Sequence, residues 1–183
     1  MSLSLEEQLF SACWNGNIET VKQLLLQQDI NINEKDDNYG YTPLIYACWN
    51  GHFEIVKILL NDNRMNANLG NNDGKTAFYV ACYRKTEIVN YMLKNENIDI
   101  NKANTYGWTP LMIASIRGYI EIIKYILVSG REININAKNN DGKTAIDYAR
   151  EKNKTEILKL LEEFEKEPEK TRNILRKELG LTG

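Results

Sequence analysis

The stretch that decides the fold is Gly40-Tyr41-Thr42-Pro43-Leu44-Ile45-Tyr46-Ala47-Cys48-Trp49-Asn50-Gly51-His52-Phe53-Glu54-Ile55-Val56. A second copy follows as Gly107-Trp108-Thr109-Pro110-Leu111-Met112-Ile113-Ala114-Ser115-Ile116-Arg117-Gly118-Tyr119-Ile120-Glu121-Ile122-Ile123. Weaker copies begin at Gly74 and Gly142, and a partial copy occupies residues 12–19. The aligned threonines at 42, 76, 109 and 144 are 34, 33 and 35 residues apart. A period of this length indicates a repeat architecture.

Each copy has the residues of a helix, a turn and a second helix. Thr42 and Thr109 are good N-cap residues, and a proline follows each at the first helical position, where its missing N–H costs nothing. Ser4 and Glu7 can form a capping box for the first helix of the partial copy. A glycine that can adopt the left-handed conformation then ends the inner helix. It recurs at Gly16, Gly51 and Gly118.

At these positions the sequence resembles the ankyrin-repeat family, in which a β-turn finger precedes two antiparallel helices. The resemblance covers about residues 4–165, and its motif positions recur in register over five units. It implies an all-α ankyrin-repeat solenoid of about five helix-turn-helix units with β-turn fingers, in a domain of residues 1–166. The expected units are residues 4–35, 36–70, 71–103, 104–138 and 139–166.

The sequence departs from the family pattern in two places. Where the family's Thr-Pro-Leu-His signature has histidine, this chain has Ile45, Tyr79, Met112 and Asp147. This departure bears on the inter-repeat hydrogen bonds that the histidine supports. The third unit also lacks one residue between Ala81 and Glu87, which predicts a local kink at its helix-to-helix turn.

The two ends of the array have the polar residues that free end units need, because stacking neighbours make the core of a solenoid. Glu6, Glu7 and Gln8 replace the finger of the first unit, and the last unit is rich in charged residues. Residues 167–183 are predicted to form an amphipathic C-terminal helix or a linker. This segment either caps the stack or begins another domain, and it carries Ile174, Leu175, Leu179 and Leu181.

The composition is that of a soluble globular protein, with 43% hydrophobic and 26% charged residues. A net charge of −2 gives no excess of cations for tracking phosphates, so we expect no nucleic-acid partner. No apolar stretch approaches the roughly 18 residues of a spanning helix, so we expect no membrane partner. The acidic N-terminus is unlike a signal peptide, which favours a cytoplasmic location.

Two Gly-Lys-Thr sequences, at residues 74–76 and 142–144, resemble the end of a phosphate-binding loop. That loop needs an earlier glycine, but the corresponding positions hold Leu69 and Ala137. We therefore interpret both sequences as the junction between a finger and a helix, and we expect no cofactor.

The cysteines and the single histidine do not suggest a metal or catalytic site. Cys13, Cys48 and Cys82 occupy one slot in consecutive units. Stacked helices lie roughly 8–10 Å apart, beyond the roughly 7 Å that a disulfide can bridge, so we expect free thiols that pack in the core. A zinc site needs four converging ligands, and a Ser-His or Cys-His pair needs a placed histidine. His52 is expected to orient the second helix, and we predict that the protein is not an enzyme.

The aromatic residues are the candidate binding residues. In the ankyrin arrangement, the slot two residues before the turn glycine and the finger positions near the glycine before threonine face the concave groove, where family members bind partners. Aromatic residues with interspersed arginine are typical of binding hot spots. The alternative is that the rings only pack between units. The candidates are Trp14, Trp49, Tyr83 and Ile116 on the inner helices, Tyr39, Tyr41, Tyr106 and Trp108 on the fingers, and the polar neighbours Asn15, Asn50, Arg84 and Arg117.

Together these observations predict a monomeric protein–protein interaction module that binds a partner protein through its concave groove. Two other functions stay open. In the first alternative, the chain is a targeting or regulatory domain of a larger enzyme or channel. In the second, it is a structural component that associates with itself. Fold-level analogy supports binding in general and does not identify the partner.

Overall fold

The computed structural model describes residues 3–83 and 85–181, and these residues form eleven helices. Ten of the helices form five pairs: α1 (Leu5–Asn15) with α2 (Ile18–Leu25), α3 (Pro43–Asn50) with α4 (Phe53–Leu60), α5 (Ala77–Ala81) with α6 (Thr86–Met92), α7 (Pro110–Arg117) with α8 (Ile120–Val128), and α9 (Ala145–Glu151) with α10 (Thr155–Lys166). Helix α11 (Pro168–Glu178) follows. Within the described residues the only β-type pairing is an isolated bridge between Gly70 and Thr76. The predicted all-α class is confirmed.

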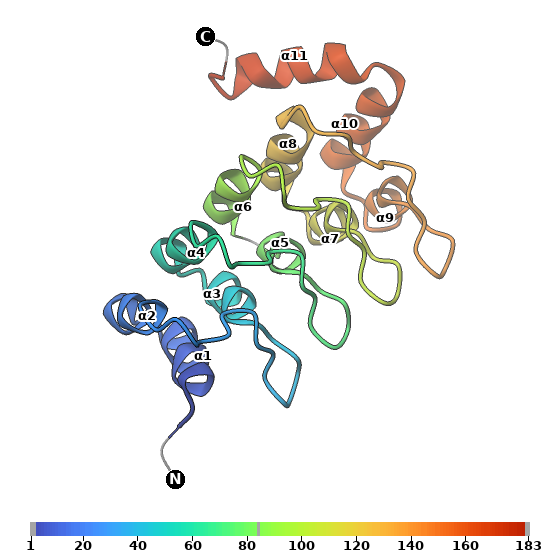
Figure 1. The fold of residues 1–183 in the computed structure, drawn as a ribbon. Coiled ribbons are helices and arrows are strands. Elements are labelled where there is room, and N and C mark those ends of the chain that lie inside the picture. The colour runs from blue at the N-terminus through green and yellow to red at the C-terminus, as the bar shows by residue number, and fades with distance from the viewer. Residues whose placement is uncertain (1–2, 84, 182–183) are drawn as a thin grey trace.

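The helix pairs stack in two rows, as expected for a solenoid (Figure 1). The inner row contains α1, α3, α5, α7 and α9, and the outer row contains α2, α4, α6, α8 and α10. Loops ahead of α3, α5, α7 and α9 project on the same side as four fingers (Figure 1). These fingers are residues 36–41, 71–75, 104–108 and 139–143. No helix in residues 3–83 and 85–181 is long and apolar enough to span a bilayer.

The helix boundaries lie where the capping residues predict them. The Ser4 hydroxyl accepts a hydrogen bond from Glu7 N at 3.1 Å, and the Glu7 carboxylate accepts one from Ser4 N at 2.7 Å, which completes the capping box. Thr42 caps α3 in the same way, with its hydroxyl 3.2 Å from Ile45 N. The turn glycines end their helices at φ values of 77°, 82° and 84°. These are left-handed conformations, which glycine adopts without strain.

The residues in the family's histidine position act within their own unit. Met112 Sδ lies 3.4 Å from Thr109 N, and Asp147 Oδ2 accepts hydrogen bonds from Thr144 N and Oγ1, both at 2.9 Å. His52 lies at the N-cap position of α4. Its side chain makes no capping bond to α4, and its Nε2 lies 2.9 Å from the carbonyl oxygen of Trp14 in the preceding unit.

The third unit differs from its neighbours at the expected turn. Helix α5 has five residues, whereas α3 and α7 have eight each. It ends at Cys82 in the right-handed region instead of at a left-handed glycine. The missing residue therefore shortens the inner helix.

The core runs continuously between the two rows, and it includes all three cysteines as free, buried thiols. Burial raises the pKa of Cys13 to about 12 and raises the pKa values of Cys48 and Cys82 as well. Because the thiolate is the reactive form, these thiols are inert packing groups at neutral pH. Among the described residues, no three histidine, cysteine or acidic side chains are grouped so that they could hold a metal ion.

Asparagine side chains join consecutive units along the loops that follow the outer helices. Asn68 Nδ2 donates to Asn97 O at 2.7 Å, while its Oδ1 accepts from Asp99 N at 2.8 Å. Asn33 and Asn101 make the same pair of bonds to the backbone one unit further on. Each amide therefore satisfies one donor and one acceptor of the next unit.

Arginine side chains donate to carbonyl groups at the end of an outer helix and in the loops that follow the outer helices. Arg64 donates to Leu25 O at 3.0 Å and Gln27 O at 3.2 Å in the first unit. Arg131 donates to Asn95 O at 3.2 Å and Ile98 O at 2.6 Å in the third unit. Because each of these carbonyl groups belongs to the preceding unit, each arginine stabilises the junction between two units.

Helix α11 uses the same device at the end of the array. Arg172 on α11 donates to Leu127 O at 3.1 Å and to Arg131 O at 2.9 Å. Leu175 is buried against α8 and α10, whereas Ile174 is half exposed. The predicted amphipathic segment is a helix, and it lies across the outer end of the stack (Figure 1).

Candidate partner-binding surface

An apolar cleft lies between α1, α3 and the finger at residues 36–41, and we call it the first cleft. Its volume is about 480 Å³. Trp14 and Trp49 are the most open inner-helix rings, with 47% and 45% of their surface exposed. Contiguous exposed apolar patches, unlike single exposed residues, often mark binding sites. The lining residues are Phe10, Ser11, Trp14, Asn15, Tyr39, Tyr41, Tyr46 and Trp49.

Four rings of this cleft, together with Tyr83 beyond it, form a continuous series that we call the aromatic track, in the order Trp14, Tyr46, Tyr41, Trp49 and Tyr83. Their consecutive ring centroids are 5.6, 5.3, 6.5 and 6.3 Å apart. At these distances neighbouring aromatic rings attract one another. The track therefore crosses from the first unit to the third without a break.

A second cleft begins where the aromatic track ends. Its volume is about 520 Å³, and it lies between α5, α7 and the finger at residues 104–108. The Arg117 guanidinium covers the Tyr83 ring at 5.3 Å from the ring centroid. This lining is more polar than that of the first cleft. It consists of Lys75, Tyr79, Tyr83, Asn104, Tyr106, Trp108, Ile113, Ile116, Arg117 and Lys152.

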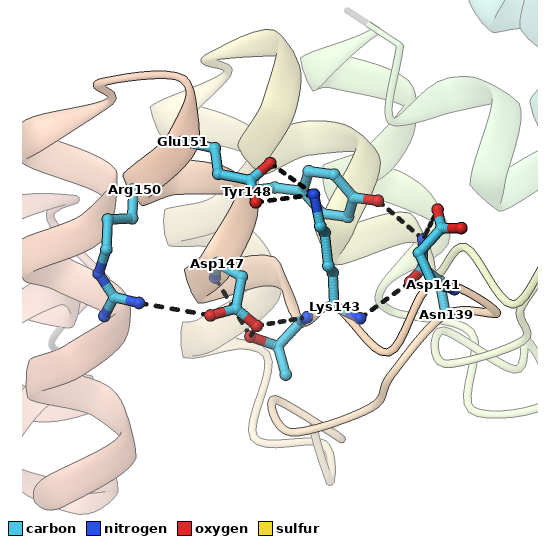
Figure 2. Close-up of polar contacts among 8 residues, drawn as sticks. Asn139, Asp141, Lys143, Asp147, Tyr148, Arg150 and Glu151 are labelled. Carbon is cyan, nitrogen blue, oxygen red and sulfur yellow. Dashed lines mark hydrogen bonds and ion pairs between the residues drawn. The ribbon is translucent and has the colours of Figure 1, made fainter.

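Trp108 packs between units, as the alternative interpretation of the aromatic residues predicts. Its ring stacks on Tyr148 of α9 with centroids 4.3 Å apart. Figure 2 shows how Tyr148 is held, with Asn139 Nδ2 donating to its hydroxyl at 2.8 Å. Lys143, whose Nζ lies 2.7 Å from Glu151 Oε1, covers the same ring. Trp108 therefore joins the fourth unit to the fifth as well as lining the second cleft.

Asp36 fixes the finger that forms one wall of the first cleft. Its Oδ1 accepts from Asn38 N and Tyr39 N, both at 2.8 Å. Its Oδ2 accepts from Tyr41 N at 2.7 Å and from the Tyr46 hydroxyl at 3.0 Å. Burial alone would raise the pKa of Asp36, but these hydrogen bonds to the charged form lower it overall. Burial and the bond to Asp36 raise the pKa of Tyr46 to about 12.

The stability of the first finger should depend on acid pH through Asp36. A lowered carboxyl pKa stabilises the fold above the unfolded-state value of about 3.9, and this stabilisation is lost as the pH falls through the folded-state pKa. We expect Asp36→Asn to flatten the decrease in unfolding free energy between about pH 5 and pH 3. Urea titrations at several pH values measure that slope.

The matched control for Asp36→Asn is Asp37→Asn, which removes the same charge from an exposed neighbour. The Asp36→Asn variant should still form the finger, because Asn71, Asn104 and Asn139 accept the equivalent backbone bonds in the other three. Equal slopes for Asp36→Asn and the wild type would show that this carboxylate does not control acid stability.

The structure brings ten of the twelve candidate residues into the two clefts. Trp14, Asn15, Tyr39, Tyr41 and Trp49 line the first, and Tyr83, Tyr106, Trp108, Ile116 and Arg117 line the second. Asn50 lies in neither, and its side-chain amide donates to Tyr46 O at 3.2 Å. Arg84 lies outside the described residues.

Sequence reasoning missed several lining residues, of which Phe10 and Tyr46 matter most. Phe10 precedes Trp14 by four residues, and Tyr46 precedes Trp49 by three, so each shares a helix face with a predicted residue. Helical spacing applied one turn earlier would have found both. Lys75 and Lys152 come from neighbouring units and have no such local signal.

Comparison with known proteins agrees with this architecture. A model of ankyrin repeats, described as three copies, matches residues 9–104 and 87–173. The ankyrin repeat and SAM domain-containing protein 6 of Rattus norvegicus is 36% identical over 99 residues, covering 52% of this chain and 11% of that protein. Alpha-latrocrustotoxin-Lt1a of Latrodectus tredecimguttatus is 31% identical over 87 residues, covering 48% of this chain and 6% of the toxin.

A putative ankyrin repeat protein of Rickettsia felis matches a longer part of the chain. It is 27% identical over 136 residues, which is 73% of this chain and 44% of that protein. The chain thus spans less than half the length of each of these three relatives.

Proposed function

Because this chain belongs to the ankyrin-repeat family, we propose that it binds a partner protein along the aromatic track and performs no catalysis. Ankyrin repeats are in general protein–protein interaction modules, and the family is typically non-enzymatic. That the partner binds along the aromatic track is inferred from the structure of this chain. The observation that carries it is the half-exposed pair Trp14 and Trp49 in a contiguous apolar cleft. Tryptophan and tyrosine in such positions are the commonest hot-spot residues.

The arrangement suits binding because the rings are already positioned before a partner arrives. Tyr41 and Tyr46 pack edge to face, and the Tyr46 hydroxyl is anchored on Asp36. A rigid surface loses little side-chain entropy on association, so more of the contact energy appears as affinity. We further propose that the chain acts as a monomer in the cytoplasm, without a cofactor, nucleic-acid or membrane partner.

The proposal predicts that Trp49→Ala weakens partner binding by roughly 2 kcal/mol, or about 30-fold in Kd. Because nearly half of the Trp49 surface is exposed, the variant should keep most of its stability. Affinity capture from cell extract identifies proteins that the wild type retains, and titration calorimetry with a retained protein measures both affinities.

Leu26→Ala is the control for this binding experiment, because Leu26 is 72% exposed at the end of outer helix α2, away from both clefts. It should bind like the wild type. A thermal scan separates binding from folding. A Trp49→Ala protein that melts normally and binds every retained protein with wild-type affinity would rule out the track as the binding surface.

A second candidate function is that these repeats target or regulate a larger protein. This candidate is favoured because the chain matches only a small part of much longer relatives, 11% of the rat protein and 6% of the spider toxin. Mass spectrometry of the protein from its native source would decide it, since a subunit of about 21 kDa would exclude this candidate.

A further inference from the structure

The charge beside the aromatic track changes sign along its length. The first cleft adjoins a hollow with which it shares Phe10 and Tyr46. Five carboxylates and one lysine line this hollow, together with four uncharged residues. The charged residues are Glu6, Glu7, Glu34, Lys35, Asp36 and Asp37. The second cleft is lined by three cations, Lys75, Arg117 and Lys152, and by no acid.

Local pairing reduces these charges without removing the contrast. Lys75 Nζ lies 2.8 Å from Asp73 Oδ2, and this pair is close to neutral. Asp36 keeps its negative charge, because its hydrogen bonds lower its pKa. Asp37 is exposed on the finger, and Arg117 and Lys152 are exposed at the other end. The walls of both clefts are rich in aromatic carbon, which strengthens the field of the charges beside them.

We propose that the partner presents an extended segment with a basic end and an acidic end, joined by apolar side chains. This inference rests on the proposed function and specifies the partner's chemistry. The basic end lies at the first cleft, where ring faces and the neighbouring carboxylates both attract a Lys or Arg side chain. The acidic end meets Arg117 and Lys152 at the second cleft, and the apolar centre covers Trp49 and Tyr83.

The dimensions of the track suit a peptide segment of moderate length. Stacked units lie roughly 8–10 Å apart, so clefts two units apart are separated by about 20 Å. An extended chain covers about 3.3 Å per residue, so about six residues join its two charged ends. A nucleic acid or an anionic membrane is repelled by the acidic end. A second copy of this chain is disfavoured, because two concave faces do not fill one another.

The inference is tested by selection from a phage-displayed library of random 12-residue peptides against the wild-type protein. Selected peptides should carry Lys or Arg at one end and Asp or Glu at the other, with about six residues between them. Lys152→Glu should weaken a selected peptide about tenfold, and Asp37→Lys should do so from the other end. Both losses should shrink in high salt, because the charges are exposed.

Lys94→Glu and Asp29→Lys are the matched controls, because they make the same charge changes at exposed positions outside the clefts. They should leave peptide affinity unchanged. Fluorescence anisotropy with a labelled selected peptide measures all five proteins.

The possible outcomes separate this inference from the proposed function. Peptides that require Trp49 but show no order of charge would overturn the inference and leave the binding surface in place. Peptides whose binding ignores Trp49 would overturn both. Light scattering that shows dimers of the wild type, abolished by Trp49→Ala, would assign the track to a second copy and overturn the peptide segment.

Discussion

Phe78→Ala is expected to lower the free energy of unfolding by about 3–5 kcal/mol, the range for removing a fully buried aromatic ring. Phe78 has no exposed surface, and it lies in α5, the shortest of the eleven helices. Helix α5 packs against α3, α6 and α7, so the cavity would adjoin both neighbouring units. Five residues of helix have little capacity to shift and fill it.

Equilibrium unfolding in urea, followed by circular dichroism, measures this loss. Phe53→Ala is the comparison, because Phe53 is only partly buried on α4 and pairs edge to face with Tyr91 at 5.6 Å. It should cost roughly 1–2 kcal/mol. A loss below about 1 kcal/mol for Phe78→Ala would mean that the third unit repacks freely around the gap.

Gly107→Ala is expected to cost about 3 kcal/mol, with two separable causes. Gly107 has φ of 76°, a conformation that strains any residue with a Cβ. An added Cβ would also lie 2.8 Å from the Asn139 Cα in the next finger. The contact would disturb the bond from Asn140 N to Tyr106 O, which is 3.0 Å long.

Gly142→Ala separates the two causes. Gly142 has the same φ of 76°, but nothing lies within 4 Å of an added Cβ. It should therefore show only the backbone strain, about 1 kcal/mol. The difference between the urea midpoints of the two variants reports the packing between adjacent fingers. Equal losses would show that the fingers do not constrain one another.

The local rules of the sequence predict most of the fold. Thr42, Ser4 and the turn glycines cap or end their helices as expected, because capping depends on residues a few positions apart. The partner of His52, the Trp14 carbonyl, could not be predicted from a local pattern because it is 38 residues away. Contacts between units depend on how the units stack, which a local pattern does not specify.

The sequence indicates which residues belong to the candidate site, but it does not indicate how residues of different units come together to form its surface. The slots before the turn glycines indicated Trp14 and Trp49 as candidates, and both line the first cleft. That Trp108 stacks on Tyr148 could not be read locally, since 40 residues separate them. The cations of the second cleft likewise come from side chains of different units, such as Lys75 and Lys152.

The arginine bonds between units have a consequence for how the array comes apart. Arg64 joins the second unit to the first, and Arg131 joins the fourth to the third. Among residues 3–83 and 85–181, no arginine side chain donates across the boundary between the second and third units. The polar bonds there come from Asn68, from the fingers and from Lys102, whose Nζ donates to Asn68 O at 2.9 Å. In a stack coupled only through neighbours, partial unfolding begins at the weakest boundary. The ring pair of Trp49 and Tyr83 crosses this same boundary, so a ligand lying over both rings would make the two halves melt as one.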